Sequence, residues 1–200
     1  AIPSGNFGNA YSAWFGRSNG LPISEIFCST NVNDVLRRFI DGGVLEPLVT
    51  QPSVAPSMDI QIPSSLERLI FDLSDGVKEF YVQLQSNSKA QLDKKSFDAL
   101  KSIFSSFTFP DDIITTLITS LHTEFDIIFD PHSVTSVQMA LDNDSSLSTV
   151  AVATASPEKF GNVISPLING FTESKIDQKE QYLTLNTENT VIIEAIKAFI

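Results

Sequence analysis

The chain has little cysteine, little positive charge and no long apolar run, and each shortage excludes a class of protein. It carries one cysteine in 200 residues, so no internal disulfide can form. Its 13 Lys and Arg against 24 Asp and Glu give a formal net charge of −11. This excess of negative charge argues against nucleic acid and anionic membranes as partners, because both require a basic surface. No run of about 18 apolar residues occurs, so we expect no membrane-spanning helix.

The few residues that could bind a metal or act as nucleophiles are scattered. Cys28 lies in the apolar run Ile26-Phe27-Cys28, which favours a buried, unreactive thiol and a reducing compartment, the cytoplasm. One cysteine and two distant histidines do not make a zinc site, so we expect no bound metal. The sequence also lacks a nucleophile elbow, the strand–turn–helix context that the serine of a hydrolase requires.

Composition and periodicity indicate a single α/β unit. Hydrophobic residues make up 42% of the chain, which suits a folded domain of ordinary size. Strands are predicted at residues 1–3 and 23–29, and helices at 10–19 and 34–40. This alternation predicts a parallel sheet with helices on both faces. We expect Asn9 and Asn33 to cap the two helices.

The rest of the chain predicts mostly helices. Ser64 and Glu67 have the spacing of a capping box, and the stretch 64–124 is expected to be a helical insertion between βα units. Within it, one face of a helix over 93–107 would carry Phe97, Leu100, Ile103, Phe104 and Phe107. Further helices are predicted at 64–73, 75–85, 110–124, 131–141, 157–168 and 188–200, and further strands at 125–129, 149–154 and 183–186.

The most informative local pattern is the loop at residues 4–9, Ser-Gly-Asn-Phe-Gly-Asn, between the first predicted strand and the first predicted helix. Glycine allows positive φ and close approach of the backbone to a ligand, and the free N–H groups of a first helical turn attract anions such as phosphate. The pattern predicts an anion cradle, although a turn that merely needs glycine has the same sequence. Tyr11, Trp14 and Phe15 share one face of the following helix, and we expect them in the core rather than against a cofactor.

Pro3-Ser4-Gly5-Asn6-Phe7-Gly8-Asn9 resembles the phosphate-binding loop of threonine synthases, which are pyridoxal-phosphate enzymes. Further segments resemble the same family, in the family's order and at similar spacing, over about residues 1–160: Ser29-Thr30-Asn31-Val32-Asn33-Asp34, Pro56-Ser57-Met58-Asp59-Ile60, Asp130-Pro131-His132 and Thr154-Ala155. The resemblance implies the C-terminal part of a pyridoxal-phosphate type II fold. Residues 1–200 would form the C-terminal portion of the large cofactor-binding domain. The N-terminal half is expected to lie outside this chain, whose sequence opens directly before the ligand loop.

By this resemblance, the loop holds the phosphate of pyridoxal phosphate and a threonine hydroxyl pairs with the pyridine nitrogen. The implied cofactor-binding residues are Gly5, Asn6, Phe7, Gly8, Asn9 and Thr154. The family usually continues Thr-Ala-His-Pro-Ala-Lys-Phe from that threonine. This chain has Ser156 and Glu158 where His and Ala are expected, a departure that bears on substrate handling.

Three other groups of residues have two interpretations each. The polar residues Thr30, Asn31, Asn33 and Asp34 face the active site by the resemblance, or cap a helix. Residues 57–59 lie close to the cofactor or form a turn. His132, in the first turn of a predicted helix, is expected to be neutral, and is either a catalytic group or a packed surface histidine.

No residue of this chain is expected to be catalytic, because the family's Schiff-base lysine lies upstream of the phosphate loop. The chain alone should therefore be inactive. The resemblance implies a threonine synthase of threonine biosynthesis, a carbon–oxygen lyase acting on a phosphate ester. It would convert O-phospho-L-homoserine and water to L-threonine and phosphate, with this small molecule and the N-terminal half of the same polypeptide as partners. A related phospho-lyase and a non-catalytic module that binds phospho-ligands are the alternatives.

Overall fold

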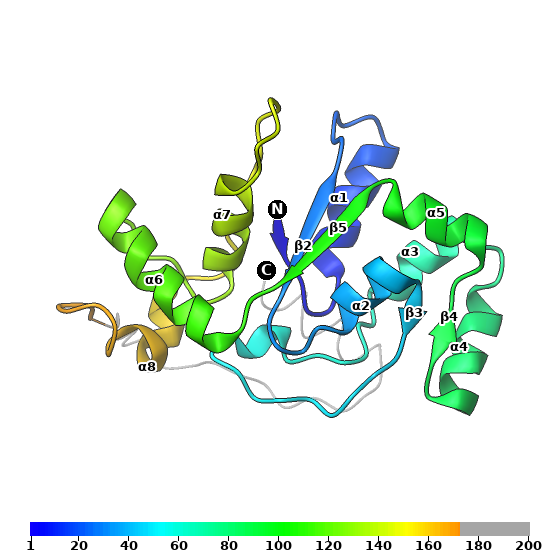
Figure 1. Cartoon of the computed structure of the whole chain (residues 1–200), viewed down its shortest axis with the longest axis horizontal. Helices are drawn as coiled ribbons and strands as arrows, with labels where there is room; N and C mark the ends of the chain where they lie inside the picture. Colours follow the sequence, from blue (N-terminus) through cyan, green and yellow to red (C-terminus); the bar gives the residue numbers. More distant parts are fainter. Residues whose placement is uncertain (173–200) are drawn as a thin grey trace, which may run out of the picture.

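A parallel three-stranded sheet forms the centre of the molecule (Figure 1). The computed structural model describes residues 1–172, so the strand predicted at 183–186 and the helix predicted at 188–200 lie outside the described residues. The sheet has the order β1 (Ile2–Pro3), β2 (Ile26–Thr30) and β5 (Phe104–Thr108). Its register pairs Pro3 with Ser29 and Thr30 with Thr108, so all three strands end at the same edge. The α/β class predicted from the sequence is confirmed.

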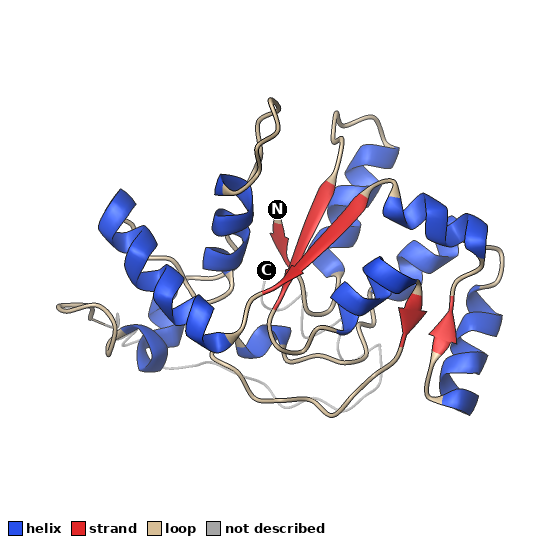
Figure 2. Ribbon diagram, in the orientation of Figure 1, coloured by secondary structure: helices blue, strands red, loops and turns tan. Residues whose placement is uncertain are grey.

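Helices cover both faces of this sheet (Figure 2). On one side lie α1 (Gly8–Ser18) and α2 (Val35–Gly42), each following the strand before it, and on the other side lies α7 (Ser133–Leu141). The remaining elements are β3 (Val44–Leu45), η1 (Pro56–Met58), α3 (Leu66–Leu73), α4 (Val77–Asn87), β4 (Ala90–Gln91), α5 (Lys94–Lys101), α6 (Asp111–Phe125), η2 (Pro157–Phe160) and α8 (Gly161–Ile164). The short strands β3 and β4 pair antiparallel.

The core beside the loop at residues 4–9 is aromatic. The ring of Phe104 in β5 lies 5.5 Å from that of Phe7 and 6.3 Å from that of Trp14. The predicted core stripe on α1 is only partly correct: Phe15 is 57% exposed, and Tyr11 and Trp14 are half-buried. The phenol of Tyr11 and the indole N–H of Trp14 both donate hydrogen bonds to Asp72, so this face of α1 also makes polar contacts.

The helix predicted over 93–107 is wrong in its second half. The helix α5 ends at Lys101, and the chain then enters β5 as the third strand of the main sheet. In a strand, residues an odd number apart point to opposite faces, and Phe104 is buried while Phe107 is 52% exposed. Phe104 and Phe107 are three residues apart, a spacing that also occurs on one face of a helix, and this spacing led to the wrong prediction. The stretch 64–124 is not a purely helical insertion, since it contributes a strand to the sheet.

Other sequence-based expectations also fail locally. No strand forms at 125–129, where Phe125 ends α6 and the next residue adopts a left-handed conformation with φ 55°. Residues 149–154 are not a buried strand: Val150 is 75% exposed, and the segment is joined to Ala1 by two main-chain hydrogen bonds of 2.8 and 3.0 Å. The helix predicted at 157–168 is the short pair η2 and α8.

The predicted helix caps at Asn9, Asn33 and Ser64 do not form. The N-caps of α1, α2 and α3 are Phe7, Asp34 and Ser65, and none of the three makes a side-chain capping bond. By contrast, Asp93 accepts a hydrogen bond from the Ser96 N–H at the start of α5. Side chains that would have capped helices bind elsewhere, as the site described below makes clear.

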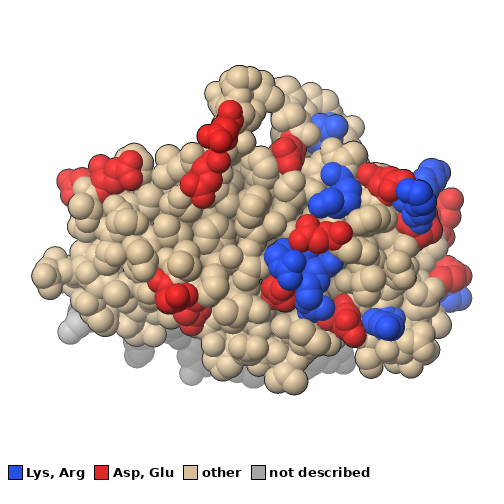
Figure 3. Space-filling model, in the orientation of Figure 1, with Lys and Arg blue, Asp and Glu red and all other residues tan. Residues whose placement is uncertain are grey.

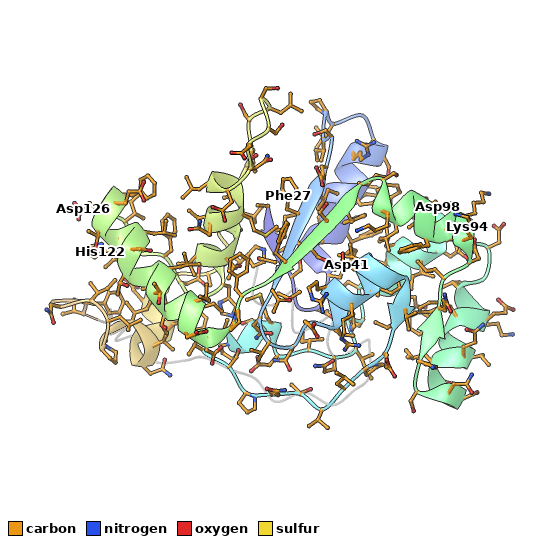
Figure 4. All side chains as sticks on the ribbon, in the orientation of Figure 1. Phe27, Asp41, Lys94, Asp98, His122 and Asp126 are labelled. Atoms are coloured by element: carbon orange, nitrogen blue, oxygen red, sulfur yellow. The ribbon has the colours of Figure 1, made fainter. Side chains whose placement is uncertain are left out.

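Charged side chains are unevenly distributed over the face in Figure 3, where Lys and Arg lie over the part that carries α1, α2 and α5. There Lys94 pairs with Asp98 at 2.8 Å and Lys101 with Asp41 at 3.3 Å. Figure 4 places His122 and Asp126 together at the far end of α6, away from the sheet. Within residues 1–172, no helix is long and apolar enough to cross a membrane.

Candidate functional site

A cavity of about 230 Å³ opens at the carboxyl edge of the sheet, where β1 ends. Segments far apart in the sequence meet there. Its walls are the whole loop at residues 4–9 together with Pro3, Ser57, Met58, His132 and Thr154. In open parallel sheets, ligands bind at this edge. The structure thus brings all six predicted cofactor-binding residues into one cavity, together with Ser57, Met58 and His132, three of the residues whose role the sequence left open.

The start of α1 supplies the floor of this cavity with free main-chain donors. The first helical bond runs from the Tyr11 N–H to the Phe7 carbonyl at 2.9 Å, so the N–H groups of Gly8, Asn9 and Ala10 precede the helical ladder. Within residues 1–172, no side chain caps them. Unpaired donors at the positive end of a helix favour an anion.

Neither glycine of the loop has a positive φ, and only Gly5 is needed for space. A Cβ on Gly5 would lie 2.6 Å from the Ser57 carbonyl oxygen, so only glycine lets the loop pass this close to the 57–58 segment. The left-handed residue of the loop is Phe7, with φ 70°, and its side chain is 1% exposed. Gly8 has open space, because the nearest heavy atom to its added Cβ would be the Ser65 hydroxyl at 3.7 Å.

The side chains of the loop point to structural roles rather than to an anion. The side-chain oxygen of Asn6 accepts hydrogen bonds from the N–H and hydroxyl of Ser64 at 2.6 and 3.0 Å, which tethers the loop to the segment before α3. The hydroxyl of Ser4 donates to the Ile2 carbonyl at 3.3 Å. Asn9 is exposed. The donors available to a ligand are thus mainly main-chain N–H groups.

Asn31, Asn33 and Asp59 form a separate polar network. One oxygen of Asp59 accepts from the side-chain amides of Asn31 and Asn33 at 2.7 and 2.9 Å and from the Ser53 hydroxyl at 2.7 Å. The Asn33 oxygen accepts from the Gln51 N–H at 2.8 Å. None of these residues lines the cavity. The network instead fixes the long segment between β3 and α3.

Asp34, the fourth polar residue after β2, pairs with two arginines of α2. It accepts hydrogen bonds from Arg37 and Arg38. Partial burial disfavours its charge, but these two hydrogen bonds and the arginine charges outweigh burial and lower the pKa of the Asp34 carboxyl. It too lies outside the cavity wall.

His132 is buried, which contradicts the surface position considered from the sequence. Its Nε2 accepts a hydrogen bond from the Ser57 N–H at 3.1 Å, so Nδ1 carries the proton and donates to Asp130 at 2.8 Å. The other carboxylate oxygen of Asp130 accepts from the Ser133 hydroxyl, which in turn accepts from the Thr154 N–H at 3.0 Å.

Sequence reasoning did not identify Asp130 and Ser133 as part of the site's surroundings. Asp130 is 1% exposed. Burial opposes its charge, but the hydrogen bonds from His132 and Ser133 outweigh burial and lower the pKa of the carboxyl. The sequence does carry one local indication, an Asp directly before a predicted helix. The side chain of an Asp in this position often accepts hydrogen bonds from the N–H groups two and three residues further on, as Asp130 does here.

Two further features carry no chemistry of this kind. A larger hollow of about 490 Å³ lies at the opposite, amino end of β1 and β2, and it offers no uncapped helix start. Cys28 is fully buried, and burial raises the pKa of its thiol to about 12, which confirms the predicted unreactive cysteine. No cluster suited to a metal ion occurs in the part of the chain that the structure describes.

The fold and the cavity together define a class: an α/β protein in which the start of a helix opens into a cavity at the carboxyl edge of a parallel sheet. No family model matches the chain. The threonine synthase of Pseudomonas aeruginosa is 31% identical over 170 residues, or 82% of this chain, and that of Saccharomyces cerevisiae is 30% identical over 88% of it. A crystal structure of pyridoxal-phosphate-bound threonine synthase from Brucella melitensis matches 99% of the chain with a TM-score of 0.81 at 28% identity. The chain is a homologue of threonine synthases and shares their fold.

The similarity covers a part of each relative. The chain spans 36% of the length of the Pseudomonas protein, 39% of the yeast protein and 46% of the Brucella chain.

Proposed function

We propose that the protein containing this chain is a threonine synthase, a pyridoxal-phosphate-dependent lyase that forms L-threonine and phosphate from O-phospho-L-homoserine and water. The observation that carries the proposal is the uncapped first turn of α1 in the floor of a cavity at the sheet edge. Homology to threonine synthases over most of the chain supports it. This chain would be the C-terminal portion of the large cofactor-binding domain of a type II fold.

The residues present fit pyridoxal phosphate. The main-chain N–H groups from Gly5 to Asn9 would hold its phosphate, because they lie at the positive end of α1. Thr154 is exposed in the cavity wall while its N–H is bound to Ser133, which leaves its hydroxyl available for the pyridine nitrogen. When bound, the cofactor supplies an electron sink for reactions at the substrate's carbon atoms.

This chain's own part in the reaction is to bind and orient. The cradle fixes one end of the ring by its phosphate, and Thr154 fixes the other by its nitrogen. No lysine lines the cavity among the described residues. The covalent attachment is therefore assigned to the region of the relatives that this chain does not cover. The single, buried Cys28 suits a cytoplasmic protein.

The test is turnover by the full-length protein with Thr154→Val as the variant. Release of phosphate and threonine from O-phospho-L-homoserine is expected for the wild type, and loss of most turnover with little change in thermal stability for the variant. Wild-type turnover in the variant would contradict the role of Thr154. Turnover of O-phosphothreonine but not of O-phosphohomoserine would point instead to a related phospho-lyase.

A further inference from the structure

A buried carboxylate lies behind the wall of the cavity, at the start of α7. Asp130 is 1% exposed, and within residues 1–172 neither a lysine nor an arginine pairs with it. The carboxylate accepts from the N–H and Nδ1 of His132 at 2.9 and 2.8 Å, from the N–H of Ser133 at 3.4 Å and from the Ser133 hydroxyl. Burying a carboxylate is unfavourable unless it is hydrogen-bonded in this way.

Two hydrogen-bonded branches run from this carboxylate to opposite parts of the cavity wall. The first passes through His132 to the N–H of Ser57. The second passes through the hydroxyl of Ser133 to the N–H of Thr154. Both branches end on main-chain groups of residues that line the cavity. They therefore hold the main chain of Ser57 and Thr154 in place and leave the hydroxyls of these two residues out of the network.

The geometry of each branch is constrained. The ring of His132 packs against that of Phe160, with centroids 4.8 Å apart, so the imidazole cannot turn freely. Ser133 is 1% exposed and its hydroxyl is used in both directions, as donor to Asp130 and as acceptor from Thr154. Within residues 1–172, the segment 149–154 is hydrogen-bonded to Ala1, to Asn143 and to α7, and the Ser133 contact is the one made at the Thr154 main chain itself.

We propose that Asp130 and Ser133 are positioning residues that hold Thr154 in the cavity wall, so that its hydroxyl faces the ring nitrogen of pyridoxal phosphate whose phosphate lies at the start of α1. This inference rests on the proposed function. It adds that the ring end of the site is set by a buried network behind the wall, whereas the phosphate end is set by α1. A mutation in the network should then weaken binding of the ring without weakening binding of the phosphate.

The chain offers a matched pair of variants. Ser133→Ala removes the acceptor of the Thr154 N–H and leaves the bonds of Asp130 to His132. Ser136→Ala is the control, because Ser136 lies on the same helix and is fully buried, and its hydroxyl donates to the main-chain carbonyls of Ser133 and Val152, both at 2.9 Å, without contact to Asp130, to the Ser133 hydroxyl or to the cavity. Both variants lose one buried hydroxyl.

The measurement is the affinity of the full-length protein for two probes. One is 4-deoxypyridoxine 5′-phosphate, which has the ring nitrogen and the phosphate but no aldehyde to bond covalently, and the other is inorganic phosphate. Ser133→Ala should weaken the first probe about tenfold, the upper range for one hydrogen bond, and leave phosphate affinity within about twofold. Ser136→Ala should leave both affinities unchanged at a comparable loss of melting temperature.

A double variant tests whether Ser133 acts through Thr154. If Thr154→Val already removes the ring contact, adding Ser133→Ala should cause no further loss of affinity for the deoxypyridoxine probe. Additive losses, equal losses in Ser133→Ala and Ser136→Ala, or unchanged probe affinity in Ser133→Ala would each overturn the positioning role. Failure of the wild type to bind either probe would instead overturn the proposed function, and the inference with it.

Discussion

At the scale of single residues, the two glycines of the loop at residues 4–9 have different neighbours. Gly5 is pressed against the Ser57 carbonyl, whereas Gly8 opens into the cavity at the start of α1. Alanine at Gly5 would force the loop and the 57–58 segment apart, and overpacking of this kind costs about 1–3 kcal/mol. Alanine at Gly8 meets no protein atom closer than 3.7 Å, so its methyl group would compete with the anion instead.

We therefore expect Gly5→Ala to lower the free energy of unfolding, and Gly8→Ala to weaken phosphate binding with little change in that free energy. Urea unfolding and phosphate titration of the same preparations measure the two effects. Gly42→Ala is the control, because a Cβ there would meet nothing within 4 Å and the residue is far from the cavity. Unchanged phosphate affinity in Gly8→Ala would place the anion elsewhere.

Asp130 should make the free energy of unfolding depend on pH in the acid range. Its pKa is lowered in the folded protein, against about 3.9 for an unfolded Asp. A carboxyl group with a lowered folded pKa contributes stability above its unfolded pKa and loses that contribution as the pH falls through the folded pKa. The free energy of unfolding should thus fall below about pH 4 more steeply in the wild type than in Asp130→Asn. Asp34 and Asp93 also have lowered pKa values but are present in both proteins, so parallel curves would contradict the prediction.

The loop at residues 4–9 could be predicted from the sequence because its information is local: a strand end, closely spaced glycines and a helix follow one another directly. The network around Asp130 could not, because Ser57 and His132 are 75 residues apart and meet only through the tertiary fold. The side chain of Asn6 shows the same limit. Its residue type fits an anion ligand, yet its oxygen is taken by Ser64, 58 residues away.

At the scale of elements, β1, α1, β2 and α2 were predicted correctly because each has its own periodicity and ends at a turn. The strand β5 was missed because Phe104 and Phe107 continue the spacing of the apolar residues in α5. Two signals stood against a helix: the run Phe-Ser-Ser-Phe-Thr has weak helix formers throughout, and Thr108 is β-branched. Parallel pairing with β2 is what makes residues 104–108 a strand, and this long-range contact cannot be predicted from the local sequence.

The position of Phe104 in β5 leads to a prediction for packing. Its ring is 1% exposed and lies against Phe7, the left-handed residue of the cradle. Phe104→Ala should lower the free energy of unfolding by about 3–5 kcal/mol and also weaken phosphate binding, since Phe7 loses its support. Phe15→Ala, on the exposed side of α1, should cost less than about 0.5 kcal/mol. Equal costs in chemical denaturation would contradict the observed packing of α1 against the sheet.

At the scale of the whole molecule, the cavity is a partial site. Under the proposed function it offers main-chain donors to a phosphate and a hydroxyl to a ring nitrogen, but no lysine is among the lining residues that the structure describes. The lysines at positions 78, 89, 94, 95 and 101 lie in α4, in α5 or between them, and Lys159 lies in η2, outside the cavity wall. The chain also spans well under half the length of the Pseudomonas and yeast threonine synthases. A complete pyridoxal-phosphate site thus requires a lysine from another part of the protein.

This requirement can be tested by fixing the cofactor in place. Borohydride reduction of the full-length protein loaded with pyridoxal phosphate should attach the cofactor to a single lysine, and peptide mapping should find that lysine outside the 200 residues of this chain. The reason is geometric: a lysine that bonds the cofactor must reach the cavity that holds the phosphate. Gly8→Ala is the control, because it should reduce the labelling without moving it. Labelling of Lys159, or of another lysine that the structure places outside the cavity wall, would show that the cavity at residues 4–9 is not where the cofactor binds.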